Sequence, residues 1–475
     1  MGQLIPPPYP EGATLSKDLQ VRNGRLFFRD VELVRLLTET LPGQQAPLGS
    51  PLEVVYLPKI TAQIEAMRGW FTQAAQAVGY PAPFHYAFAS KANSAEEVTR
   101  TALAAGAHYE TSSAADVDIV RYCLDRGWMP PDRWAINNGF KVPGSVYTEK
   151  LIRLRADGFA NVIPVFEDLD ELGPFIESGL SFRVGLRQKI DRHARDRESI
   201  RRADTRFGMD VPTMHQAARR IAEAPNLTLV MYHAMQGDIS SDPAGWLQGF
   251  RASLHLDAEL ARAYPTLSQY NWGGGFPAAI GDLRTFDYAG FVRQMLSIAR
   301  ETSQAEGIPA PQMVGEYGRY TTAEHGFHLF RVLKAKENGS ALPWYLIDGS
   351  VMSAFPDAWA LGLEFLVLPL NHLDRPFRQV RLGGLTCDGD DIYPTRPEHG
   401  PLYLPAETQD LYIGFFGIGC YQEMLGGVRG VKHCLLPEAA ELIISAGADG
   451  ALQYRVLGGQ RYDEILELLG YTPPA

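Results

Sequence analysis

Cysteine is scarce in this sequence: Cys123, Cys387, Cys420 and Cys434 are the only four among 475 residues. Four thiols are too few for a disulfide framework in a chain of this length, so reduced cysteines are expected. No uninterrupted apolar run reaches the roughly 18 residues that a membrane-spanning helix needs. The first residues contain no cationic stretch followed by an apolar one, so no secretory signal is predicted. These absences predict a soluble, cytoplasmic protein with no membrane partner.

Basic residues are outnumbered as well. The sequence contains 44 Lys and Arg residues and 55 Asp and Glu residues, which gives a formal net charge of -11. Proteins that bind nucleic acids usually present a basic surface, so no nucleic-acid partner is expected. Hydrophobic residues make up 45% and charged residues 21% of the chain, a globular composition that argues against a disordered or fibrous protein.

The central part of the chain alternates between strand and helix patterns. After an initial VVYLP, strands are predicted at HYAFASK, YETS, WAINN, VIPVF, SFRVGLR, TLVMYHA, QYNWGGG and QMVGEYG, with helical segments between most of them. One helix is predicted to begin at Ser94, because Glu97 follows it at capping-box spacing. Eight or nine strands alternating with helices favour a (β/α)8 barrel of the TIM type over a shorter open sheet.

We predict three parts along the chain. Residues 1–50 form an N-terminal arm with a strand and helix that join a β domain, and residues 51–320 form the barrel. Residues 321–475 contain extended segments with few helices between them, which predicts a β-rich domain, an antiparallel barrel or sandwich. The final YDEILELLGY predicts a short C-terminal helix.

Reactive side chains occur at several predicted strand ends, which face the active site in a (β/α)8 barrel. Lys91 follows one strand, and an amine there can form a Schiff base with a carbonyl cofactor. The glycines Gly273 to Gly275 follow another strand and would let backbone N–H groups approach a phosphate. In GEYGRY, Glu316 could contact a protonated ring nitrogen, and Arg319 could pair with a phosphate or carboxylate.

Two further groups lie in the β-rich part. TCDGDD combines the thiol of Cys387 with the acids Asp388, Asp390 and Asp391, which suits binding a cation and moving a proton; Tyr421 follows a strand in GIGCYQEMLGG. Each feature taken alone also fits a structural role, such as a surface lysine, a flexible loop, a surface salt bridge, an exposed acidic turn or a core tyrosine. The calcium-loop pattern is incomplete, and no metal site is predicted.

In chain order these features resemble the fold-type III pyridoxal-phosphate-dependent decarboxylases of basic amino acids (the ornithine and diaminopimelate decarboxylase superfamily), most closely the biosynthetic arginine decarboxylases. The resemblance rests on YAFASKAN, YETSSAAD, NNGFK, FPDAWALGLEFLVLPLNHLD, LTCDGDD and GCYQEMLG, which run from about residue 50 to residue 430. PDAW with its VLPL continuation and the YQE segment are the most specific. The fold that the resemblance implies is a TIM-type barrel followed by a β domain.

The resemblance also implies roles for individual residues. Lys91, His233 and Cys387 match catalytic residues: the lysine joined to the cofactor's aldehyde, the histidine stacked on its ring, and the thiol that protonates the carbon left by CO2. Other implied contacts with pyridoxal 5'-phosphate are Glu316 at the pyridine nitrogen, Gly273, Gly274, Gly275, Arg319 and Tyr421 near the phosphate, and Glu110 and Arg187 at the cofactor end of the barrel.

The implied substrate is a basic amino acid. Asp388 matches the acid that holds the distal cation of the substrate, and Asp357 of PDAW and Asp391 are expected beside it. In this family Cys387 and Asp388 reach the barrel of the partner subunit, so a homodimer with shared active sites is implied, alone or within a higher oligomer. The expected reaction converts L-arginine to agmatine and CO2, which feeds polyamine biosynthesis.

The chain departs from the family pattern at three points. Gln236 in HAMQG replaces a serine that contacts phosphate, Tyr317 stands where relatives have Pro or Ser, and the helical insertion of the arginine enzymes is missing. Ornithine, lysine and diaminopimelate stay open as alternative substrates, and no motif supports a role for Mg²⁺. A racemase is disfavoured because such enzymes place Arg against the pyridine nitrogen. A non-catalytic regulatory relative is disfavoured because both the lysine and the thiol are present.

Overall fold

The computed structural model describes residues 7, 9–190, 205–278, 286–337, 339 and 341–471. The chain divides into two compact units, each built from separate segments of the sequence. The barrel unit contains the described residues between Thr61 and Pro277 and between Phe286 and Thr321. The β unit contains mainly the described residues up to Ile60 and those from Thr322 onward. None of the helices in the described ranges has the length and apolar character that crossing a bilayer demands.

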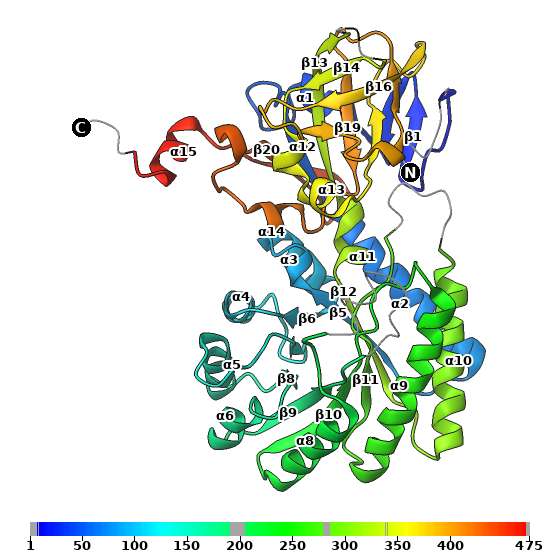
Figure 1. Cartoon of the computed structure of the whole chain (residues 1–475), viewed down its shortest axis with the longest axis vertical. Helices are drawn as coiled ribbons and strands as arrows, with labels where there is room; N and C mark the ends of the chain where they lie inside the picture. The colour runs from blue at the N-terminus through cyan, green and yellow to red at the C-terminus, as the bar shows by residue number, and fades with distance from the viewer. Residues whose placement is uncertain are drawn as a thin grey trace. The chain divides into compact units, whose positions relative to one another are not determined.

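In the barrel unit, parallel strands close on themselves, with β9 beside β10 and β12 beside β5 (Figure 1). The strands are β5 (Phe84–Ala89), β6 (His108–Thr111), β7 (Ala135–Asn137), β8 (Val162–Phe166), β9 (Phe182–Arg187), β10 (Leu227–His233), β11 (Gln269–Asn271) and β12 (Gln312–Tyr317). The helices are α2 (Pro58–Val78), α3 (Glu96–Ala104), α4 (Ala114–Asp125), α5 (Val146–Ala156), α6 (Leu172–Glu177), α8 (Val211–Glu223), α9 (Pro243–Ala263), α10 (Tyr288–Glu306) and α11 (Arg319–Thr322), with the 3-10 turn η1 (Ser90–Ala92). The predicted (β/α)8 barrel is therefore confirmed.

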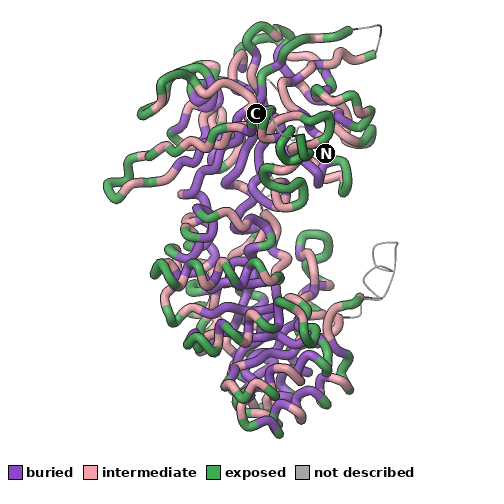
Figure 2. Tube along the Cα trace, turned by 90° about the vertical axis from the view of Figure 1, so that its left-hand side faces the viewer, coloured by how far each residue is buried: buried purple, intermediate pink, exposed green. Residues whose placement is uncertain are grey.

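The barrel strands are short and apolar because both of their faces are covered. All five residues of VIPVF in β8 are buried, as expected for a parallel strand between a packed interior and surrounding helices. A buried cluster drawn from several strands lies inside: Ala87, Trp134, Ile136, Ile163, Val165, Val230, Met231 and Val314. In Figure 2, buried segments occupy the middle of this unit.

The start of α3 differs from the prediction. The N-cap is Ala95 rather than Ser94, and it makes no side-chain cap. Instead the backbone N–H of Ala95 donates to Asn93 Oδ1, and the Ser94 hydroxyl donates back to the carbonyl of Ser90. Because Ser94 Oγ bonds to the preceding turn, it is not used as a helix cap, and the predicted capping box at Ser94 is wrong.

The β unit is built around a ten-stranded sheet and a separate three-stranded sheet (Figure 1). Its strands are β1 (Leu19–Arg22), β2 (Arg25–Phe28), β3 (Val31–Glu32), β4 (Leu52–Tyr56), β13 (Gly326–Lys336), β14 (Trp344–Ile347), β15 (Leu366–Pro369), β16 (Phe377–Gly383), β17 (Ile392–Tyr393), β18 (Leu402–Pro405), β19 (Tyr412–Phe416), β20 (Ala440–Ala446) and β21 (Leu452–Leu457). Its helices are α1 (Leu33–Thr38), α12 (Val351–Ala354), α13 (Pro356–Leu361), α14 (Gln422–Gly426) and α15 (Tyr462–Leu468), with 3-10 turns η2 (Ala323–His325), η3 (Pro397–His399) and η4 (His433–Leu435). Most pairings are antiparallel as predicted, but β14–β16 and β4–β20 are parallel.

Strand β4 lies in the β unit, although the sequence places residues 51–320 in the barrel. It pairs antiparallel with β13 and parallel with β20. Leu52, Val54 and Tyr56 pack in one cluster with N-terminal side chains such as Leu26 and Phe28. The pattern of a short apolar strand predicts burial, but it does not predict the sheet in which the strand pairs. The position of VVYLP just before the barrel segments therefore indicated the wrong unit.

A buried lysine links the N-terminal segment to the start of α2. Lys59 is 1% exposed, and its Nζ bonds to Asp18 and lies 2.8 Å from Glu324 Oε2. Arg29 Nε also donates to Asp18, at 2.7 Å. Burial alone would raise the pKa of Asp18, but Lys59 and Arg29 outweigh that effect and lower it.

We predict that Lys59→Met lowers the free energy of unfolding by about 3 kcal/mol, because it removes the buried cation between Asp18 and Glu324 and leaves Asp18 with Arg29 alone. Chemical denaturation followed by intrinsic fluorescence measures the change. Lys150→Met is the matched control, since Lys150 is partly exposed and pairs with Asp118 at the surface. The control should cost less than about 1 kcal/mol. Equal effects of the two substitutions would contradict the prediction.

Candidate active site

Each strand of the barrel has a polar side chain at or just after its carboxyl end. In strand order they are Lys91, Glu110, Asn138, Glu167, Arg187, His233, Asn271 and Glu316. The carboxyl ends of parallel barrel strands share one face, where enzymes of this architecture have their active sites. Five predicted site residues, Lys91, Glu110, Arg187, His233 and Glu316, therefore meet at one end of the barrel.

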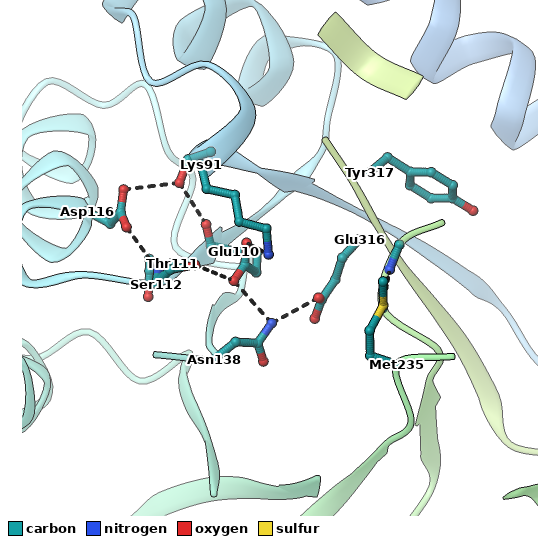
Figure 3. A network of polar contacts seen from close by, with 12 residues as sticks. Lys91, Glu110, Thr111, Ser112, Asp116, Asn138, Met235, Glu316 and Tyr317 are labelled. Atoms are coloured by element: carbon teal, nitrogen blue, oxygen red, sulfur yellow. Dashed lines mark hydrogen bonds and ion pairs between the residues drawn. The ribbon is translucent and has the colours of Figure 1, made fainter. Parts of the chain in front are cut away.

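Lys91 lies on η1, directly after β5. The preceding Ser90 fixes this turn, because its hydroxyl contacts the carbonyl of Glu110 at 3.0 Å and Asp116 Oδ1 at 3.1 Å. Lys91 Nζ lies 3.5 Å from Glu110 Oε2, and Figure 3 shows the lysine side chain directed toward this carboxylate. The side chain of Lys91 is 50% exposed, so its amine is accessible to a carbonyl compound.

The segment after β6 holds Glu110 in place through a capping box on α4. Ser113 Oγ accepts from the backbone N–H of Asp116, and Asp116 Oδ2 accepts from the N–H groups of Ser112 and Ser113. The hydroxyl of Ser112 donates to Glu110 Oε1 at 3.0 Å. The YETSSAAD motif is thus a strand, a cap and a helix start that fix the position of one buried acid.

Asn138 connects the two buried acids of the site. Its Nδ2 donates to Glu110 Oε1 at 3.1 Å and to Glu316 Oε2 at 2.9 Å (Figure 3). The other oxygen of Glu316 accepts from Asn271 Nδ2 at 2.7 Å and lies 3.5 Å from His233 Nε2. All five side chains lie on or next to strand ends and are almost completely buried.

The surroundings shift the pKa values of the two acids in opposite directions. Burial raises the pKa of Glu110, and the nearby Glu316 carboxylate adds to the effect, against the opposing charge of Lys91. Burial also acts on Glu316, but His233, Lys91 and the Asn138 hydrogen bond outweigh it and hold the pKa of Glu316 well below its usual range. Burial lowers the pKa of His233. Of the two acids, Glu316 is therefore the one that stays ionised at neutral pH.

The glycines after β11 form a turn that has no room for side chains. Gly273 has φ +69°, and a Cβ there would lie 2.5 Å from Met235 Sδ. A Cβ on Gly274 would lie 2.7 Å from the carbonyl of Glu316, and one on Gly275 would lie 2.1 Å from that of Gly237. The N–H of Gly273 donates to Asn271 Oδ1 at 2.8 Å. The turn therefore brings bare backbone close to Glu316 without a side chain between them.

Arg187 and Arg319, both predicted to contact the cofactor, lie in different surroundings. Arg187 Nη1 pairs with Glu167 Oε1 at 2.7 Å, and its guanidinium lies over the ring of Phe207. Glu167 also accepts from the N–H of Gly208, which secures this pair. Arg319 begins α11, two residues after β12 ends, and is half-buried.

Two of the departures from the family pattern have structural explanations. Gln236 is buried, and its Nε2 lies 3.5 Å from Ser253 Oγ on α9. A Cβ on Gly249 would lie 2.4 Å from Gln236 Oε1, so this oxygen fills the space beside the glycine. The side chain of Gln236 is therefore engaged with the helix α9. Tyr317 points away from Glu316 in Figure 3 and stacks on Tyr86 with ring centroids 4.4 Å apart.

The remaining predicted residues lie in the β unit. Asp391 accepts hydrogen bonds from the hydroxyl of Ser350 (3.0 Å), from Met352 N (3.2 Å) and from both N (3.0 Å) and Oγ1 (2.7 Å) of Thr386. Asp357 is 1% exposed and exchanges two hydrogen bonds with Gln422. These contacts give both acids a role in the local fold, and their predicted substrate contacts stay predictions.

Cys387 and Asp388 follow β16 on a loop and are more accessible. Cys387 is exposed, and its Sγ lies 3.5 Å from Cys434 Sγ. The neighbouring thiol of Cys434 raises the pKa of Cys387, which keeps it protonated at neutral pH. Asp388 Oδ2 lies 3.7 Å from His433 Nε2. Tyr421 precedes α14 with φ +66°, a left-handed conformation that is unusual for a tyrosine and frequent at functional sites.

The fold and this end of the barrel define a (β/α)8 enzyme with a lysine amine placed for carbonyl chemistry beside a buried carboxylate. The family model described as "Pyridoxal-dependent decarboxylase, pyridoxal binding domain" matches residues 63–323, more than half of the chain. The chain belongs to this family and is a pyridoxal-phosphate-dependent decarboxylase.

Similar proteins support this membership. The biosynthetic arginine decarboxylase of Deinococcus radiodurans is 23% identical over 90% of this chain and 81% of its own length, and that of Parasynechococcus marenigrum is 24% identical over 93% and 86%. Among solved structures, the biosynthetic arginine decarboxylase of Campylobacter jejuni has a TM-score of 0.74 at 19% identity over 96% of this chain and 89% of its own. The diaminopimelate decarboxylase of M. jannaschii has a TM-score of 0.78 at 16% identity over 95% and 98%. Both structures share the fold.

The carboxyl end of the barrel fits pyridoxal phosphate. His233 Nδ1 and Asn138 Oδ1 are buried without a hydrogen-bond partner within the described residues, and buried polar atoms usually have one. An ionised Glu316 suits a protonated pyridine nitrogen, the Lys91 amine suits an aldehyde, and the bare glycine turn suits a phosphate. When bound, the cofactor supplies an electron sink for the electrons that CO2 leaves behind.

Asn138 and Asn271 were not predicted as site residues. The sequence does carry a weak signal for both: each stands at a strand end, one in NNGFK and the other just before the three glycines. A neutral amide gives no hint of its importance without knowledge of the carboxylates that face it, because those acids come from distant parts of the chain.

We predict that Asn138→Ala weakens binding of pyridoxal phosphate by about 10- to 100-fold, because it removes the donor shared by Glu110 and Glu316. Titration of the cofactor-free protein, followed by cofactor absorbance, measures the dissociation constant. Asn161→Ala is the matched control, since Asn161 Nδ2 bonds to the carbonyl of Pro131 away from the site. An unchanged dissociation constant for Asn138→Ala would show that the amide does not organise the site.

Proposed function

We propose that this enzyme decarboxylates L-arginine to agmatine and CO2. The observation that carries the reaction class is the placement of the Lys91 amine 3.5 Å from Glu110, with the ionised Glu316 held by Asn138, Asn271 and His233. The choice of arginine is supported by the arginine decarboxylases among its relatives, which align with most of the chain. A carboxylate that binds a guanidinium through two hydrogen bonds is a strong and specific contact.

The residues at the end of the barrel would divide the work as follows. Lys91 would hold the cofactor through its amine, and Glu316 would keep a positive charge on the pyridine nitrogen. The ring of His233, at the end of β10, would pack against the face of the cofactor. The turn from Gly273 to Gly275 would receive the phosphate, and Arg319 and Tyr421 stay predicted contacts of the phosphate. Glu110, which has a raised pKa, lies within reach of the Lys91 amine and can hold a proton there.

Cys387 and Asp388 would complete the site. Cys387, protonated at neutral pH, returns a proton to the α carbon after CO2 departs. Asp388 binds the distal cation of the substrate, with Asp357 and Asp391 supporting the surrounding segments. We propose that these groups reach the barrel of a second copy of the chain, so that a homodimer has two shared active sites.

Decarboxylation of diaminopimelate is a second candidate. The M. jannaschii diaminopimelate decarboxylase matches this fold with a TM-score of 0.78, slightly above the value for the C. jejuni arginine decarboxylase. The two substrates differ at the distal end, where one has a guanidinium and the other an ammonium with a carboxylate. An acidic distal pocket around Asp388 favours the guanidinium, because a substrate carboxylate would be repelled there.

We predict CO2 release from L-arginine, with kcat/KM at least about tenfold above that for ornithine, lysine or diaminopimelate. Lys91→Ala should reduce release from arginine by about 10³-fold or more and abolish the visible absorption band of the bound cofactor. Lys150→Ala, at the surface, is the control and should retain both. Faster CO2 release from diaminopimelate than from arginine would identify diaminopimelate as the substrate instead. No release from any of the four amino acids would refute the proposal.

We predict that Cys387→Ala keeps the cofactor bound but lowers the rate of product formation by about 10²-fold, because the α carbon loses its proton donor. Cys123→Ala, which removes a buried thiol in α4, is the control. Mixing Cys387→Ala with Lys91→Ala under subunit exchange should restore up to about a quarter of the wild-type rate, since half of the dimers then hold one intact shared site. Exchange without recovery would show that each chain uses its own Cys387.

A further inference from the structure

The exposed loops of the β unit bring together three metal-ligating side chains that the decarboxylase reaction does not account for as a group. Cys387 lies on the loop after β16, and His433 and Cys434 begin η4, about 46 residues further along the chain. One ligand atom from each residue lies within 4.8 Å of the other two. Among the described residues this is the one such group of three or more cysteine, histidine or carboxylate side chains.

The distances in this cluster suit a tetrahedral cation. With a zinc–sulfur bond of about 2.3 Å, two thiolates on one tetrahedral ion lie roughly 3.8 Å apart. The two Sγ atoms here are 3.5 Å apart, so little movement would place both on one ion. A disulfide bond would need the sulfurs at about 2.05 Å, which is a larger change.

The surroundings of His433 support the same conclusion. Its Nε2 lies 3.7 Å from Asp388 Oδ2, so Nδ1 is the nitrogen left for a metal. A carboxylate beside the second ring nitrogen of a metal-binding histidine is a common arrangement, and a movement of less than 1 Å would bring Asp388 within hydrogen-bond distance of His433. Cys434 has φ +54°, a left-handed conformation, and the following Leu435 has φ +56°. This turn places two adjacent ligands, His433 and Cys434, on the side where Cys387 lies.

We propose that Cys387, Cys434 and His433 bind a thiophilic divalent transition-metal cation, with Zn²⁺ as the expected occupant. Thiolate and imidazole ligands select such ions over Mg²⁺ and Ca²⁺, which prefer oxygen. Three protein ligands leave one tetrahedral position open, and all three side chains are exposed, so the ion can exchange with solution. The site does not depend on the identity of the amino-acid substrate. Because a metal-bound Cys387 is a thiolate and cannot donate a proton, binding of the ion and the proton donation proposed above exclude each other.

Titration of the reduced, metal-free holoenzyme with Co²⁺ tests the site directly, because a thiolate-bound tetrahedral Co²⁺ has charge-transfer and ligand-field absorption bands. We expect one Co²⁺ per chain in difference spectra, and displacement by one Zn²⁺. Cys434→Ser and His433→Ala should weaken uptake by at least about 100-fold. Cys123→Ala, which removes a thiol from the barrel unit, should bind Co²⁺ like the unaltered protein.

A second measurement needs no variant. Bound Zn²⁺ should protect Cys387 and Cys434 from alkylation, as mapped by peptide mass spectrometry, and a chelator should remove the protection. Absence of uptake and of protection would overturn the proposal. The proposal would also be overturned if no metal binds and hydrogen peroxide joins the two thiols in a disulfide bond. In that reaction two thiols and one peroxide give one disulfide and two waters. Because no substrate is present in either measurement, failure of the metal site and failure of the decarboxylase assignment are read separately.

Discussion

The active site depends on one constraint, which is that two carboxylates must stay buried a few ångströms from a lysine without both becoming protonated. Asn138 meets this constraint because its single NH2 group donates to Glu110 and Glu316 together. His233 and Asn271 contact Glu316 but not Glu110, so Glu316 is the carboxylate that stays ionised. Because each of these side chains comes from a different strand, the closed barrel is what brings them within hydrogen-bonding distance.

Several parts of this arrangement could be predicted from the sequence. Strands were recognisable because buried parallel strands are short apolar runs, and Lys91 and Glu316 stand out as polar residues at their ends, whereas His233 was identified only through the family resemblance. The prediction failed where the deciding partner is far away in the sequence. VVYLP reads as a buried strand, but the pairing of β4 with β13 and β20 is set by residues about 270 and 390 positions later. Ser94 has the spacing of a helix cap, but its hydroxyl donates to Ser90 instead.

The same limit applies to acids in the β unit. TCDGDD reads as a cluster of equivalent charges, but the structure separates them. Asp391 accepts hydrogen bonds from the backbone and hydroxyl groups around it, whereas Asp388 remains accessible beside His433. Cys434 had no assigned role in the sequence, because nothing in its own segment indicates that a loop 47 residues earlier carries Cys387 next to it. Chemistry that depends on pairs across loops becomes visible only with the tertiary structure.

The contact between Gln236 and α9 also has a consequence for how this sequence can drift during evolution. Gln236 Oε1 fills the space that any side chain at position 249 would occupy, so the two positions are coupled. A lineage that acquires a serine at position 236 frees that space and no longer needs glycine at 249. With Gln236 in place, a side chain at position 249 of α9 forces the Gln236 amide to move. Substitutions at 236 and 249 should therefore be inherited as a pair.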